Sequence, residues 1–144
     1  MDHKEFITHL DEARIEGAIA AAELKTSGEI CVYISHRERH EALEFARRRF
    51  QELGLFRTKR RNAVLIYIVP RTRQVAVLGD LGIHEKCSEA FWAQVVSHLT
   101  ARFKEGSFTE AIVEAVTEVG AALAQHFPPV DDDTDELPNK LARD

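Results

Sequence analysis

The stretch that decides the fold is residues 61–70, which read Arg-Asn-Ala-Val-Leu-Ile-Tyr-Ile-Val-Pro. Every residue from 63 to 69 is apolar or aromatic, without the alternation of polar side chains that marks a strand with one wet face. Pro70 follows at once, and proline cannot continue a central strand. The stretch therefore predicts a central strand that is covered by other layers on both faces.

A second apolar run, residues 30–34, is predicted to be a strand that pairs in parallel with the first. The chain between them, residues 37–55, reads as a helix, because apolar side chains recur there at spacings of three and four and Gly54 supplies a stop. These side chains are Ala42, Leu43, Ala46, Phe50 and Leu53. A strand, a helix and a strand in this order form a crossover unit, whose two strands are parallel.

A third strand is predicted at residues 75–78. The linker 70–73 is too short for a crossover, so this strand must return as a hairpin. The fold class is thus α/β: a three-layer α/β/α sandwich whose small mixed sheet has two parallel strands plus an antiparallel hairpin strand. About four helices flank the sheet, at residues 11–25, 37–55, 88–104 and 107–127, and residues 81–84 are expected to be a loop.

The length of 144 residues predicts one domain, which we place at residues 1–127. Residues 128–144 are expected to be a flexible acidic tail, because Asp131 to Glu136 offer many carboxylates and little to bury, and only Leu137 is suited to dock back. Cys31 and Cys87 have neither disulfide nor zinc spacing and are expected to be reduced, buried thiols. The chain shows no signal peptide and no apolar run of membrane-spanning length, so we expect a soluble cytoplasmic protein with no membrane partner.

Although the net charge of the chain is −5, one segment of it is strongly basic. Residues 36–73 hold eleven Lys and Arg against four Glu. Such a segment is one signature of nucleic-acid binding, but the interleaved glutamates and the acidity of the whole chain favour a solvated helix face instead. We do not expect nucleic-acid binding, and we keep as an alternative that residues 37–61 bind an acidic partner.

The predicted topology brings polar residues from three strand ends to one edge of the sheet. Glu29 opens the first strand, Asn62 opens the second, Asp80 follows the third, and His84 comes four residues later. Carboxylate and amide oxygens suit calcium or magnesium, whereas His84 would extend the choice to zinc or manganese. The alternative is that Asp80 pairs with Arg61 or caps the following turn, Glu29 is a solvated strand end, and His84 is a surface loop residue.

Covalent catalysis has little support in the sequence. The serines lie outside any nucleophile elbow, and Cys87 has a histidine three residues back but no third group to orient it. A phosphate-binding glycine loop is also absent, since Gly79-Asp80-Leu81-Gly82 has no lysine.

The chain nevertheless resembles a known family, the TPM domain family, and within it a small, soluble bacterial branch. The motifs that carry the resemblance occur in the family's order along nearly the whole chain. They are residues 26–30 (Thr-Ser-Gly-Glu-Ile), 58–67 (Thr-Lys-Arg-Arg-Asn-Ala-Val-Leu-Ile-Tyr), 79–83 (Gly-Asp-Leu-Gly-Ile), 91–92 (Phe-Trp), 103–108 (Phe-Lys-Glu-Gly-Ser-Phe), 126–128 (His-Phe-Pro) and 135–138 (Asp-Glu-Leu-Pro).

The resemblance implies an α/β/α domain and divalent-metal binding in an acidic cleft. For the plant members involved in photosystem repair it also implies an acid-phosphatase activity. Broader relatives often have Asp-Asn-Gly before the second strand, where this chain has Arg61-Asn62-Ala63, so a competing guanidinium replaces an expected ligand.

The resulting hypothesis is a cytoplasmic, non-enzymatic or weakly enzymatic TPM-like domain that binds Ca²⁺ or Mg²⁺ at Glu29, Asn62, Asp80 and His84. A metal-dependent phosphatase is the first alternative and the acidic-partner module the second. The hypothesis names no physiological protein partner.

Overall fold

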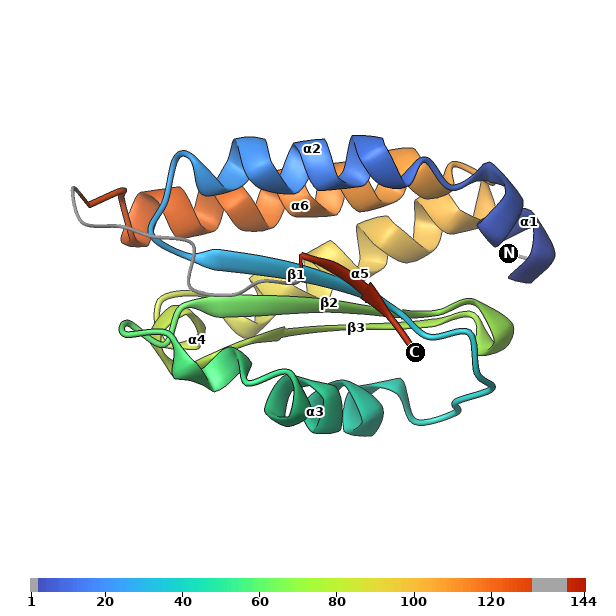
Figure 1. Ribbon diagram of the computed structural model, residues 1–144, viewed down its shortest axis with the longest axis horizontal. Helices are drawn as coiled ribbons and strands as arrows, with labels where there is room; N and C mark the ends of the chain where they lie inside the picture. The colour runs from blue at the N-terminus through green and yellow to red at the C-terminus, as the bar shows by residue number, and fades with distance from the viewer. Residues whose placement is uncertain (1–2, 131–139) are drawn as a thin grey trace.

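The computed structural model of the protein describes residues 3–130 and 140–144. Its sheet has the strand order β3-β2-β1-β4 (Figure 1). Strands β1 (Glu29–Ile34) and β2 (Ala63–Val69) run parallel, and β3 (Gln74–Gly79) returns antiparallel to β2. The crossover and the hairpin predicted from the sequence are therefore confirmed.

Two layers of helices enclose this sheet, as expected (Figure 1). Helices α2 (Glu12–Glu23), α5 (Glu89–Lys104) and α6 (Phe108–His126) lie on one face, and α3 (Ala42–Glu52) covers the other. The strands divide their side chains between the two layers by simple alternation. In β1, Ile30, Val32 and Ile34 pack toward the first face, whereas Cys31 and Tyr33 belong to the core beneath α3.

Some helix boundaries differ from the expectation. The helix predicted at residues 11–25 is α2, and an additional helix that was not predicted, α1 (His3–His9), precedes it. Asp11 caps α2 by accepting a hydrogen bond from Arg14 N, while Thr8 bonds back to Lys4 O within α1. Helix α3 begins five residues later than predicted, at Ala42. The expected loop 81–84 is a short helix, α4 (Leu81–His84), because the Asp80 carboxylate caps it.

The C-terminal segment is the main departure from the sequence prediction. Residues Leu141–Arg143 form β4, which pairs in parallel with β1 at the edge of the sheet, so the last part of the expected flexible tail is docked. Leu137, which we expected to be the docking residue, lies outside the described residues. Composition could not predict β4, since it binds through main-chain pairing and ion pairs rather than through an apolar stripe.

Asp144 fastens the end of β4 to the loop after β1. Its carboxylate accepts hydrogen bonds from Ser35 Oγ (2.5 Å) and from His36 N (2.9 Å). Burial acts to raise the pKa of Asp144, but these two hydrogen bonds and the charge of Arg49 bring it below its usual value. Docking of β4 is therefore coupled to the ionisation of Asp144.

We expect β4 to loosen at acid pH. A carboxyl whose pKa is lowered by folding stabilises the folded state above its unfolded pKa of about 3.9, and this contribution is lost as the pH falls through the folded pKa. Amide NMR signals of residues 141–143 should therefore begin to shift below about pH 4, before those of β2. An identical acid transition in Asp144→Asn would contradict this assignment.

Two further expectations can be compared with the structure. Cys31 is buried, and burial raises the pKa of its thiol to about 12, so the thiol stays protonated; Cys87 is only partly buried. None of the helices in the described part of the chain has the length and apolar character needed to cross a bilayer.

Candidate metal site at the strand ends

The backbone brings the three strand-end residues to the same end of the sheet. Glu29 lies opposite Ala63 in the register of β1 and β2, and Asp80 N donates a hydrogen bond to Ala63 O (2.9 Å). Asn62 directly precedes Ala63, and its carbonyl oxygen accepts from Glu29 N (3.3 Å). Glu29 and Asp80 therefore flank the start of β2 from its two neighbouring strands.

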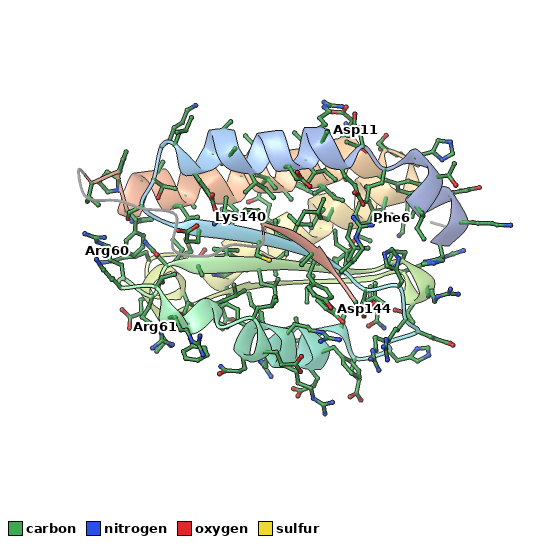
Figure 2. All side chains as sticks on the ribbon, in the orientation of Figure 1. Phe6, Asp11, Arg60, Arg61, Lys140 and Asp144 are labelled. Carbon is green, nitrogen blue, oxygen red and sulfur yellow. The ribbon has the colours of Figure 1, made fainter. Side chains whose placement is uncertain are left out.

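Asp80 is held by the cation that replaces the expected ligand. Arg61 donates to both carboxylate oxygens of Asp80, from Nε (2.6 Å) and from Nη2 (2.8 Å), and this hydrogen bonding raises the pKa of the guanidinium. The same carboxylate also accepts from Leu81 N (2.8 Å) at the start of α4. Both structural roles considered for Asp80 are thus present at once. Figure 2 shows Arg60 and Arg61 at the end of the sheet where β2 begins.

Glu29 is buried, with 3% of its surface exposed, so it is not a solvated strand end. Its carboxylate contacts the ammonium group of Lys140, the residue before β4. The ammonium group also lies 3.0 Å from Glu23 Oε2, and this oxygen accepts from Ile30 N (2.8 Å). Glu23 and Lys140 were missed by sequence reasoning, because nothing local connects the end of α2 or the tail with the start of β1.

Asn62 is also buried, and its side chain is only half satisfied. Its Nδ2 donates to Ser27 Oγ (3.3 Å), whereas Oδ1 has no hydrogen-bond partner among the described residues. A buried acceptor in this state is destabilising unless water or a cation reaches it. Asn62 therefore has an unsatisfied hard oxygen donor at the position directly before Ala63.

His84 lies at the end of α4 with an exposed side chain. Its main-chain N donates to Asp80 O (2.8 Å), so it follows Asp80 by one helical turn. Within residues 3–130 and 140–144, no group of three or more His, Cys, Asp or Glu side chains is already gathered around one point. The donors thus fit a hard cation in chemical type, while Arg61 and Lys140 already neutralise both carboxylates.

A groove of about 400 Å³ opens beside Asp80 on the face of the sheet that α3 covers. Two guanidinium groups contribute to its wall. The residues that line it are Arg47, Phe50, Gln51, Arg61, Leu78, Gly79, Asp80 and Leu81.

The rest of the basic segment is largely engaged within the chain. On α3, Arg47 pairs with Glu44 (3.0 Å) and Arg49 with Glu52 (2.7 Å). Arg48 lies over the ring of Phe45, 5.2 Å from its centre. These contacts agree with the solvated helix face that the interleaved glutamates predicted.

Comparison with known proteins decides the family. The sequence profile of the TPM domain matches residues 1–122. The chain belongs to the TPM domain family. It is 34% identical to the BA42 protein from the psychrophilic bacterium Bizionia argentinensis, known from an NMR structure, with a TM-score of 0.84 over 94% of this chain and 96% of that one.

A more distant TPM-like fold occurs in the N-terminal domain of a protein from P. gingivalis, also solved by NMR. It is 18% identical, with a TM-score of 0.68 over 84% of this chain and 82% of the other, and so it shows the fold alone. No curated protein matches the chain.

Proposed function

We propose that this TPM domain binds a single hard divalent cation, Ca²⁺ or Mg²⁺, weakly at the end of the sheet where β1 and β2 begin. The observation that carries the proposal is the position of two buried carboxylates, Glu29 and Asp80, on either side of Ala63. Asn62, whose buried Oδ1 has no partner among the described residues, directly precedes Ala63 in the chain. Buried carboxylates and amide oxygens are the donors that these ions prefer.

The four residues proposed from the sequence have distinct roles in this site. Glu29 and Asp80 supply the negative charge, and Asn62 supplies a neutral oxygen. His84 lies one helical turn after Asp80 and can join from the outer side, by a ring nitrogen or through a water molecule. Binding is expected to be weak, because the cation must compete with Arg61 at Asp80 and with Lys140 at Glu29.

The first test is substitution of the two carboxylates. Asp80→Asn and Glu29→Gln keep the side-chain shape and remove the charge, so each should weaken Ca²⁺ or Mg²⁺ binding by about tenfold or more. Titration of CaCl₂ and MgCl₂, followed by calorimetry and by amide NMR shifts, measures the change. Glu16→Gln, an exposed charge loss on α2, is the matched control and should bind like the wild type. Unchanged affinity in both cleft variants would remove the site.

A metal-dependent phosphatase is the second candidate function, and the groove beside Asp80 favours it. Arg47 and Arg61 on its wall suit a phosphate group, and a bound cation would polarise a phosphoryl oxygen. We expect little turnover of an aryl phosphate, since the described residues that line the groove offer no base or nucleophile besides Asp80 itself. Cation-dependent hydrolysis that disappears in Asp80→Asn would establish the enzyme instead of the simple binding domain.

A further inference from the structure

The C-terminal segment places a cationic side chain, that of Lys140, in the proposed site. Lys140 Nζ contacts the carboxylates of both Glu29 and Glu23, and Lys140 O accepts a hydrogen bond from Val32 N (2.7 Å). The ammonium group is therefore fixed by the same main-chain pairing that places β4 beside β1. Figure 2 shows Lys140 at the start of β4 and Asp144 at its far end.

The three charged side chains of this cluster are largely buried. The side chains of Glu29, Glu23 and Lys140 are 4%, 15% and 16% exposed, so water screens their charges poorly. The ammonium group of Lys140 is shared between the carboxylates of Glu29 and Glu23. A divalent ion at Glu29 would have to share this carboxylate with the ammonium group of Lys140, which repels the ion. The two cations therefore exclude one another at the same oxygens.

We propose that Lys140 is an internal competitor for the divalent cation, so that cation binding at Glu29 and docking of β4 on β1 oppose each other. This inference rests on the proposed function and adds a means of regulating it. Thermodynamic linkage makes the opposition reciprocal: a docked β4 lowers cation affinity, and a bound cation weakens the docking of β4 by the same factor.

Release of Lys140 has a defined structural consequence. Val32 N loses its acceptor, and the edge of β1 gains main-chain groups that an extended segment can pair with. The remaining anchors of β4 lie farther along the strand, where Arg143 pairs with Glu12 and Asp144 binds Ser35. The cation would thus loosen β4 from its Lys140 end.

The test compares two lysine substitutions in the full-length chain. Lys140→Met removes the competing charge and should raise the affinity for CaCl₂ about tenfold, within the usual range for coupled sites. Lys25→Met is the matched control: it removes a nearby, exposed charge two residues from Glu23, and its affinity should stay within about twofold of the wild type. Calorimetry at constant ionic strength measures both.

A second readout does not depend on the variants. In the wild type, CaCl₂ should shift the NMR signals of residues 141–143, whereas NaCl at equal ionic strength should not. If Lys140→Met binds Ca²⁺ no better than the wild type while Glu29→Gln binds it worse, the inference is wrong and the proposed function survives. If wild type, Lys140→Met and Glu29→Gln all fail to bind, the proposed function itself is wrong. If Lys140→Met does not fold, unchanged 141–143 signals at saturating CaCl₂ overturn the inference.

Discussion

Alanine at position 82 should destabilise the protein by about 3 kcal/mol or more, the upper end of what overpacking costs. A Cβ atom on Gly82 would lie 2.2 Å from Arg60 O and 2.7 Å from Arg61 O, and both are main-chain atoms. Arg61 O also accepts a hydrogen bond from Gly82 N (2.8 Å), so it cannot move away without breaking this bond. The loop before β2 would therefore separate from α4, and Arg61 would lose its alignment with Asp80.

Gly17→Ala is the matched control for this experiment. Gly17 lies on the exposed side of α2, and a Cβ there would meet nothing within 4 Å. Alanine should stabilise the helix by about 0.5–1 kcal/mol. Denaturant unfolding of both variants gives the two free energies. A Gly82→Ala protein within about 0.5 kcal/mol of the wild type would show that α4 and the Arg60–Arg61 loop are not in contact in solution.

Removal of residues 140–144 should lower the free energy of unfolding by about 3 kcal/mol, because it leaves Glu29 and Glu23 without the ammonium group that neutralises them. For a chain of this size the melting temperature should fall by about 6–12 °C. The same deletion removes the acceptor of Val32 N and the carboxylate that binds Ser35 and His36. Thermal unfolding at pH 7 measures the effect.

A double variant distinguishes the contribution of the ion pair to stability from the contribution of β4 strand pairing. In a Glu29→Gln background the deletion should be less costly, since one of the two carboxylates that lose the ammonium group is already neutral. Equal costs in both backgrounds would assign the loss to strand pairing rather than to the ion pair. A melting temperature within about a degree of the wild type would mean that residues 140–144 contribute nothing, as first expected for a tail.

The buried carboxylates of Glu29 and Asp80 are each paired with a cationic side chain of the same chain. Arg61 comes from the loop before β2, and Lys140 comes from the far end of the sequence. Removing one member of such a pair is costlier than the pair is stabilising, because the other charge stays buried. The same pairs set the affinity that a divalent ion can reach, so stability and cation binding are expected to change in opposite directions in Lys140→Met.

The sequence by itself determined the layered architecture. The seven apolar residues of β2 can only be buried on both faces, and the helical periodicity between β1 and β2 requires a parallel crossover. The short linker after Val69 requires the reversal into β3. From these local patterns it also follows that Glu29, Asn62 and Asp80 reach one end of the sheet.

Only the tertiary structure decided what those side chains contact. The pairing of Glu29 with Lys140 joins residues 111 positions apart, and the buried Oδ1 of Asn62 is defined by what surrounds it. Periodicity reports which face of an element is buried, whereas an ion pair depends on the register of elements distant in the sequence. Residues 141–143 have neither the length nor the apolar pattern of a strand, and they become β4 because the edge of β1 and the charges of Glu29 and Glu12 are in place to receive them.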